Sequence, residues 1–307
     1  MNVHPSRLAK VAASTALAGT MLLVAGCGQS LDDAGSSTDA QPKKQADLAK
    51  LLPASIRDKG TITVAAAVYA PAVMTPPAGG EPTGWDIENT RQAASLLGLK
   101  VKFKVIPFDG VVPGLQAGRF DAATGEIYVT AERTKTVTFV VNHVSKDEFL
   151  VPADSKHTSF AQESDVCGLV IGAQLGSAEA DSADKLAAKC NKSGAKKTTV
   201  KTFADQATVA LALTQGRVDI NLASGSQAAY TADKSNGKLK VAKMGFGDQV
   251  QTGLALARNK DTAQLAKAFE AATNELIKTG ALQKILDKYN GGLGAVDKSE
   301  IVPAPTS

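Results

Sequence analysis

The sequence predicts an α/β protein of two lobes, each a sheet flanked by helices, with two crossovers of the chain between them. Strand-like and helix-like segments alternate over residues 61–124, and the alternation restarts after Pro152. Such alternation is typical of a parallel sheet covered by helices. The segment from about Asp47 to Tyr289 is long enough for two compact lobes with separate cores.

The first lobe opens with a predicted strand and continues with alternating elements. Val101, Phe103 and Val105 alternate with lysines, which indicates a half-buried strand. Ile87, Ala94 and Leu97 have the spacing of one helix face. The predicted strands of this lobe are 61–66, 101–105 and 121–124, and the predicted helices are 86–97 and 110–117.

The same order of elements recurs in the second lobe, after which the chain returns to the first. The predicted strands are 169–173, 199–203, 219–223 and 253–257, and the predicted helices are 178–190, 205–215, 228–232, 262–279 and 281–289. Crossovers are expected near 143–148 and 251–253. Lobe 1 is therefore expected to comprise 47–147 plus 252–290, and lobe 2 to comprise 148–251. The tail 291–307 contains turn residues and prolines and is expected to be loose.

The first 26 residues have the layout of a secretory signal peptide. Arg7 and Lys10 precede an apolar stretch over 11–24, and small residues lead to Cys27. The apolar stretch is shorter than the roughly 20 residues of a spanning helix, which disfavours a permanent transmembrane segment. The end of the stretch resembles the bacterial lipobox, which implies a lipid on Cys27, anchorage to the outer face of the cell membrane and a flexible tether over 27–46.

Charge and composition exclude a nucleic-acid-binding protein. Loss of Arg7 and Lys10 with the signal peptide lowers the formal net charge from +4 to +2, with the other charges interspersed along the chain. Aromatic residues are 5% of the chain, too few for a platform on which bases stack.

With Cys27 assigned to the lipid, Cys167 and Cys190 form an even pair in an oxidising compartment. A disulfide is the expected state, and two buried free thiols are the alternative. A metal site is not expected, because the mature chain has only His143 and His157 and they lie in unrelated contexts. No cofactor is expected.

Four short motifs carry a resemblance to a known family. They are Gly84-Trp85-Asp86-Ile87-Glu88, residues 108–122 closing with Thr130-Ala131-Glu132-Arg133, Gln174-Leu175-Gly176-Ser177, and Gly216-Arg217-Val218-Asp219. In this order and spacing the chain resembles the family 3 solute-binding proteins, the receptors of polar amino-acid ABC importers. The resemblance implies a two-lobed periplasmic-binding-protein-like fold (type II), a small-molecule ligand, ABC permease partners and a monomer.

The resemblance also implies ligand contacts. Arg133 would hold the ligand's α-carboxylate, since a guanidinium donates two parallel hydrogen bonds and stays charged when desolvated. The alternative for Arg133 is a surface ion pair. Ser177 and the helix start that follows Gln174 would bind the same carboxylate, or Ser177 is a plain cap. Phe108 and Tyr69 would contact the ligand, with core packing as the alternative for both.

The departures from the family pattern concern the ammonium site. Ser224 replaces the usual lobe-two Asp, Glu126 replaces a Gly, and Tyr128 replaces a Thr or Ser. One hypothesis is that Glu126 supplies the missing negative charge from the first lobe. In the rival account Glu126 pairs with Arg133 or a nearby Lys, and the ligand is not an α-amino acid. Ala67 replaces an Asp of the first loop, which weakens the case for a strongly basic substrate.

Three functions are therefore compared. A transport receptor is favoured, and no enzymatic activity is expected. A dehydratase of cyclohexadienyl acids on the same fold is the enzymatic alternative, with Glu126 as an acid; yet the sequence lacks a Gly-x-Ser-x-Gly elbow, a phosphate loop and a Cys/His pair. A sensory lipoprotein that binds its ligand without an importer is the third.

Overall fold

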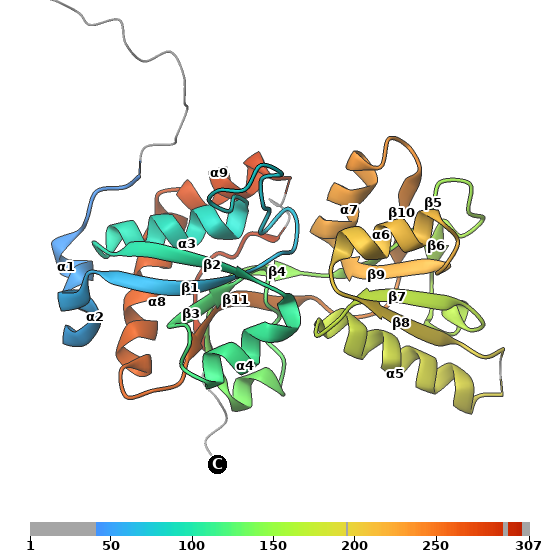
Figure 1. The fold of residues 1–307 in the computed structure, drawn as a ribbon, viewed down its shortest axis with the longest axis horizontal. Coiled ribbons are helices and arrows are strands. Elements are labelled where there is room, and N and C mark those ends of the chain that lie inside the picture. Colours follow the sequence, from blue (N-terminus) through green and yellow to red (C-terminus); the bar gives the residue numbers. More distant parts are fainter. Residues whose placement is uncertain (1–40, 195, 291–293, 303–307) are drawn as a thin grey trace, which may run out of the picture. The chain divides into compact units, whose positions relative to one another are not determined.

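The computed structural model describes residues 41–194, 196–290 and 294–302. The signal segment 1–26 and most of the tether 27–46 lie outside these residues. Within the described part of the chain, no helix is long and apolar enough to cross a membrane. Two six-stranded sheets, each flanked by helices, make up the fold (Figure 1), which confirms the α/β class.

The first sheet combines parallel and antiparallel strands in the order β12-β4-β11-β3-β1-β2. Its strands are β1 (Thr61–Ala67), β2 (Lys100–Ile106), β3 (Ala122–Thr124), β4 (Val137–Ser145), β11 (Val250–Ala257) and β12 (Ile301–Val302). Strands β2, β1 and β3 are parallel as predicted, whereas β11 is antiparallel to β3 and β4. The sequence pattern did not predict β4, because nearly all its residues are buried and it lacks the alternation of a half-buried strand.

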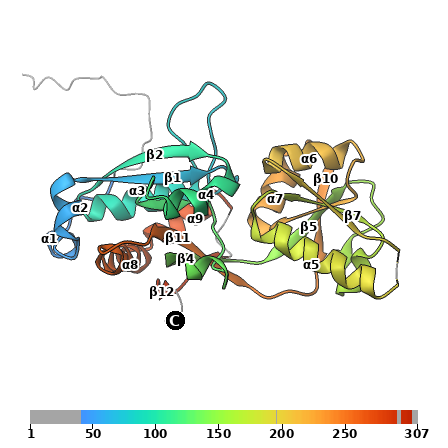
Figure 2. The same ribbon diagram turned by 60° about the horizontal axis from the view of Figure 1, so that its bottom comes forward.

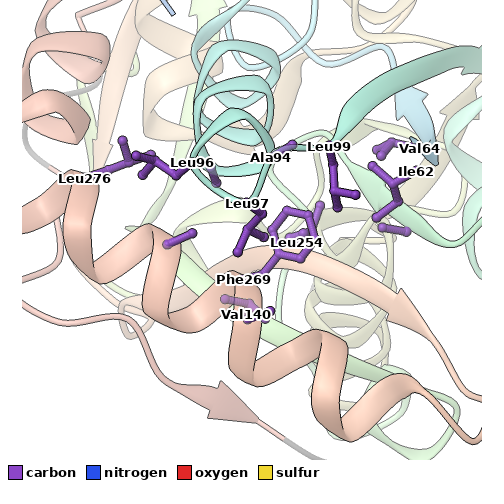
Figure 3. Packing of buried hydrophobic residues seen from close by; sticks show 14 of the residues in the cluster. Ile62, Val64, Ala94, Leu96, Leu97, Leu99, Val140, Leu254, Phe269 and Leu276 are labelled. Atoms are coloured by element: carbon purple, nitrogen blue, oxygen red, sulfur yellow. The ribbon is translucent and has the colours of Figure 1, made fainter. Parts of the chain in front are cut away.

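Helices cover both faces of the first sheet. They are α1 (Ala46–Ala49), α2 (Ala54–Lys59), α3 (Trp85–Leu96), α4 (Val111–Gln116), α8 (Thr262–Lys278) and α9 (Ala281–Lys288), with 3-10 turns η1 (Phe108–Gly110) and η2 (Arg133–Lys135). The larger core joins the sheet to α3 and α8, where Leu97, Leu254 and Phe269 gather (Figure 3). A smaller core under α4 contains Phe108 and Leu115. The predicted helix 110–117 is therefore the end of η1 followed by α4.

The second sheet has the order β6-β10-β5-β9-β7-β8. Its strands are β5 (Asp147–Pro152), β6 (Ser159–Phe160), β7 (Val170–Gln174), β8 (Thr199–Phe203), β9 (Ile220–Ser224) and β10 (Leu239–Met244). The three predicted strands β7, β8 and β9 are parallel, and β5 is antiparallel to both β9 and β10. The predicted parallel arrangement thus holds for three adjacent strands at one end of each sheet.

Helix α5 (Ala178–Lys192) covers one face of the second sheet, and α6 (Gln206–Thr214) and α7 (Gly225–Lys234) cover the other (Figures 1 and 2). Ser177, Asp205 and Ser224 each accept a backbone N–H three residues later and cap these helices. Because Ser224 is the last residue of β9 and the other two caps closely follow the ends of β7 and β8, the helices begin at the carboxyl edge of the sheet.

The disulfide between Cys167 and Cys190 is present, which confirms the expected pairing. Cys167 follows the 3-10 turn η3 (Glu163–Val166), and Cys190 lies buried in α5, with 5.3 Å between the two Cα atoms. The alternative of two free thiols is therefore wrong.

The chain passes between the two sheets twice. Lys146 alone separates β4 from β5, and residues 245–249 separate β10 from β11. Asp147 already pairs with Ser224 in the second sheet, and Val250 pairs with Ser145 in the first. The limits of the sheets therefore fall one or two residues from the predicted lobe boundaries.

The expectation of a loose tail over 291–307 is wrong for the part that contains β12. The Ser299 hydroxyl donates to the Val141 carbonyl at 2.6 Å, and the Ser299 N–H donates to Asn274 Oδ1 at 2.9 Å. Ile301 pairs with Val140 of β4. A strand of two residues has no periodicity, so the pattern could not reveal this edge pairing.

Candidate functional site

Most of the predicted site residues stand at or just after the carboxyl ends of parallel strands. Tyr69 follows β1 and Phe108 follows β2, whereas Gln174 ends β7 and Ser224 ends β9. The carboxyl edge is where open α/β sheets bind ligands. Hydrogen bonds join the residues of the first sheet to those of the second.

The Arg133 guanidinium reaches from the first lobe to the second. Its Nη1 donates to the Tyr128 carbonyl at 3.0 Å and its Nη2 donates to the Gly176 carbonyl at 3.0 Å. The guanidinium carbon lies 5.6 Å from the centre of the Phe108 ring. Burial lowers the pKa of Arg133, an effect that the negative charge of Glu179 opposes. No ion pair among the described residues includes Arg133, so the surface ion pair is not what the structure shows.

The start of α5 lies at the point that Arg133 reaches. Ser177 is fully buried, and its hydroxyl accepts the Ala180 N–H at 3.1 Å, so the predicted cap is present. The preceding Gly176 has a φ of 78°, and a Cβ there would lie 2.7 Å from Cα of Asp109 in the first lobe. Only glycine fits both this conformation and this approach of the two chain segments.

Tyr69 makes two hydrogen bonds with the second lobe. Its hydroxyl donates to Glu179 Oε1 at 2.6 Å and accepts the Ser224 N–H at 2.9 Å. Burial and the neighbouring charges of Glu179 and Glu126 raise the pKa of Tyr69 well above its usual range. The ring also packs in the core beside Phe108, with 6.0 Å between ring centres, so the core alternative applies to part of each side chain.

Glu126 has a backbone conformation that normally selects glycine. Its φ is 53°, in the left-handed region. The N–H groups of Gly125 and Glu126 both donate to Asp86 Oδ2, at 2.9 and 3.0 Å, and Asn142 holds the other oxygen of Asp86. The positive φ of this turn explains why the family pattern has a glycine at the position of Glu126. The turn directs the Glu126 side chain inward.

Glu126 is 2% exposed, and its carboxyl group lies beside hydroxyl groups. Oε2 accepts the Ser226 hydroxyl from α7 at 2.8 Å, whereas Oε1 has no hydrogen-bond partner in the described part of the chain. Burial raises the pKa of Glu126 to about 8, although the hydroxyls of Ser226 and Ser145 favour the ionised form. No ion pair among the described residues includes Glu126, so the pairing with Arg133 or a lysine is not observed.

A second acid lies at the crossover between the sheets. The Tyr128 hydroxyl donates to Asp147 Oδ1 at 2.8 Å. Burial, followed by the charge of Glu179, raises the pKa of Asp147 to about 7. Burial likewise raises the pKa of Tyr128 well above its usual range. The charges of Tyr69 and Glu126 also raise the pKa of Tyr128, so the three residues belong to one polar cluster.

Two predicted residues use their hydrogen bonds within the fold. Gln174 Nε2 donates to the carbonyls of Val68 in the first lobe and Ala204 in the second, at 3.4 and 3.5 Å. The Ser224 hydroxyl accepts the Gln227 N–H at 3.2 Å as the cap of α7. The hydrogen bonds that the Arg133 guanidinium makes with described residues go to Tyr128 and Gly176 and to neither of these side chains.

A cavity of about 370 Å³ borders this cluster at the crossovers. Ser145 and Ser226, the two hydroxyl groups near Glu126, contribute to its lining together with Lys146 and Lys243. Of the described residues that line it, none is Arg133, Phe108 or Tyr69. The side chains of Arg133, Phe108 and Tyr69 pack against other residues of the protein and not against the cavity. No group of His, Cys, Asp and Glu in the described part of the chain is arranged to hold a metal ion.

The fold and these motifs correspond to one known family. Residues 62–292 match the sequence model of the bacterial extracellular solute-binding proteins, family 3. The chain belongs to this family. It is also similar to the arginine-binding protein ArgT of Corynebacterium glutamicum, with 25% identity over 301 residues that cover 96% of each chain.

Two solved structures show the same fold as this family 3 protein. One is an ancestral arginine-binding protein bound to arginine, with a TM-score of 0.66, 27% identity, and coverage of 75% of this chain and 98% of that one. The other is the ancestral amino-acid-binding protein AncCDT-1, a precursor of cyclohexadienyl dehydratase, with a TM-score of 0.67, 25% identity, and coverage of 76% and 97%.

Three polar residues of this cluster were missed by the sequence analysis of the family 3 chain. Glu179 and Ser226 each stand two residues after a predicted site residue, Ser177 and Ser224, on the first turn of α5 or α7. Asp147 follows the crossover directly. Their closeness in sequence to predicted site residues was the signal that could have revealed them. An acid in the first turn of a helix is, however, also explained by the helix dipole, so the signal was not specific.

Proposed function

We propose that this family 3 protein is the substrate-binding lipoprotein of an ABC importer and captures an amino acid by closure of its two lobes. The observation that supports this most is the 3.0 Å hydrogen bond from Arg133 to the Gly176 carbonyl, because it brings a first-lobe guanidinium to the start of a second-lobe helix. An α-carboxylate bound at that place is held by both lobes at once.

The binding mechanism follows from which contacts a ligand replaces. Arg133 now donates to two neutral carbonyls, and a carboxylate is a stronger partner for the same fork. The ligand's ammonium group would pair with Glu126, whose Oε1 has no other partner in the described residues. A ligand favours the closed state only through contacts that it makes with both lobes. Closure also removes water and strengthens each charged contact.

Export, lipid attachment at Cys27 and recognition by a permease complete this proposal. The signal-like segment before Cys27 and the tether to the first helix at Ala46 support anchorage at the outer face of the cell membrane. The family is one of extracellular proteins, which agrees with this location. We expect the protein to act as a monomer and to present its closed lobes to the permease.

The dehydratase alternative keeps one specific observation in its favour. Burial raises the pKa of Glu126 to about 8, so this carboxyl group holds a proton that it could donate near neutral pH. Incubation of the purified protein with prephenate-like acids decides between the functions. Turnover would favour the enzyme, and its absence together with amino-acid binding would favour the receptor.

The amino-acid hypothesis predicts that the ammonium group contributes to affinity. Mass spectrometry of ligand released from the denatured protein identifies candidates, and calorimetry then compares each amino acid with its desamino analogue. Glu126→Gln should weaken binding of the amino acid selectively. Equal affinity of the wild-type protein for the two compounds would contradict the role of Glu126.

Closure predicts a steric effect at Gly176. Gly176→Ala should weaken amino-acid binding at least ~10-fold, because the new Cβ lies 2.7 Å from Cα of Asp109 where the lobes meet. Gly216→Ala is the matched control, since Gly216 also has a positive φ (65°) but has no atom within 4 Å of the new Cβ. Calorimetry that gives equal losses for both variants would mean that backbone strain, not the lobe contact, sets the affinity.

A further inference from the structure

Three carboxyl groups from different elements lie around two tyrosines in the candidate site. Glu179 of α5 accepts the Tyr69 hydroxyl, Asp147 of β5 accepts the Tyr128 hydroxyl, and Glu126 follows β3. The charge of Glu179 raises the pKa of both Glu126 and Asp147. Glu179 is therefore the common neighbour of the other two acids.

These acids are held by hydroxyl groups, not by cations. None of the three takes part in an ion pair among the described residues. Arg133 is the basic group whose charge interacts with Glu179. When a ligand displaces the proton of Glu126 and Asp147 keeps its own, the carboxylates of Glu126 and Glu179 and the Arg133 guanidinium sum to one negative charge, which is costly to bury without a partner.

A second observation is that two buried polar atoms of the cluster lack a hydrogen-bond partner in the described part of the chain. Glu126 and Ser145 are 2% and 5% exposed, and neither Glu126 Oε1 nor the Ser145 hydroxyl has a hydrogen-bond partner in the described part of the chain. Ser145 lies close enough to Glu126 to lower its pKa. Ser145 also lines the cavity of about 370 Å³, a volume in the range of small-ligand sites. Buried polar atoms of this kind normally have partners.

We infer that Glu126, Glu179 and Asp147 select a ligand with two cationic groups, one bound at Glu126 and the other between Glu179 and Asp147. Resting on the proposed function, this makes the solute a basic amino acid, with its carboxylate on Arg133. Such a ligand carries one net positive charge and neutralises the site, whereas a neutral amino acid leaves a buried negative charge. The loss of the first-loop Asp at Ala67 is thereby offset by acids from other elements.

The direct test compares L-arginine with L-citrulline, which has the same shape but a neutral side chain, by calorimetry on the chain from residue 28 on. Removing residues 1–27 deletes no part of any described helix or strand. L-arginine should bind at least ~10-fold more tightly than L-citrulline. Citrulline binding as tight as or tighter than arginine would overturn the inference and leave amino-acid capture intact.

Variants show whether the named acids cause the preference. Glu179→Gln and Asp147→Asn should each reduce the arginine-to-citrulline ratio several-fold, while Asp184→Asn, an exposed change on the same helix α5, leaves it unchanged. The glutamine can still accept the Tyr69 hydroxyl, so Glu179→Gln keeps this contact. An unchanged ratio in both site variants would overturn the inference.

Agmatine, which is arginine without its carboxylate, separates the inference from the proposed function. Binding of agmatine with no binding of any amino acid would support the acidic selection and refute carboxylate capture.

Proton release on binding is a further test. Because the pKa of Glu126 is about 8, a cation that pairs with it at about pH 7 should displace a proton. Calorimetry in buffers of different ionisation enthalpy should detect this release for arginine, and Glu126→Gln should abolish it. No release from the wild-type protein would count against the cation site at Glu126.

Discussion

Arg133→Ala should weaken amino-acid binding at least ~30-fold, because truncating one member of a buried charge pair costs about 2 kcal/mol or more. The Arg133 side chain joins the two lobes through its hydrogen bond to the Gly176 carbonyl, just before the cap of α5. The variant removes both a partner for the carboxylate and the contact with the Phe108 ring. Calorimetry with the solute identified by mass spectrometry measures the loss.

Arg119→Ala is the matched control for this variant. Arg119 lies in the same lobe with its guanidinium 5.8 Å from the centre of the Phe120 ring, but it is exposed, whereas Arg133 donates to the Gly176 carbonyl of the second lobe. The affinity of Arg119→Ala should equal that of the wild-type protein. An unchanged affinity for Arg133→Ala would remove the assignment of the carboxylate site.

The second large effect concerns stability. Replacing Cys167 and Cys190 together by serine should lower the free energy of unfolding by about 3 kcal/mol, because the disulfide closes a loop between residues 23 positions apart and restricts the unfolded chain. Urea denaturation followed by circular dichroism measures the change. The bridge joins the segment after η3 to α5, the helix that begins at Ser177.

Reduction of the wild-type protein is the independent check on this prediction. Dithiothreitol should shift the wild-type unfolding midpoint toward that of the double variant and leave the variant's midpoint unchanged. Equal unfolding free energies for the oxidised, reduced and substituted proteins would show that the pairing of Cys167 and Cys190 has no stabilising effect.

The helices and strands were predictable to different extents from residue patterns. Strands such as β2 alternate apolar residues with lysines, and helices such as α8 repeat apolar residues on one face, so local spacing was sufficient. The buried strand β4 has no such alternation, because both of its faces are covered. Strand β12 is too short for any pattern, and its pairing with β4 joins segments far apart in the chain.

The candidate site shows the same limit at the level of single side chains. Motif spacing placed Arg133 and Ser177, and the structure brings the guanidinium to the residue before that helix cap. The partner of Tyr69 is Glu179, 110 positions away, and the partner of Glu126 is Ser226, 100 positions away. No local pattern encodes those pairs.

The sequence by itself determined the α/β class, the recurrence of strand and helix that builds two sheets, and the cysteine pair, because these depend on local periodicity and on composition. Only the tertiary structure decided which polar groups meet at the site. The hydrogen bonds of Glu179 and the pKa shifts of Glu126 and Asp147 depend on how distant segments pack, and two charges interact only weakly until folding brings them together and removes the water between them.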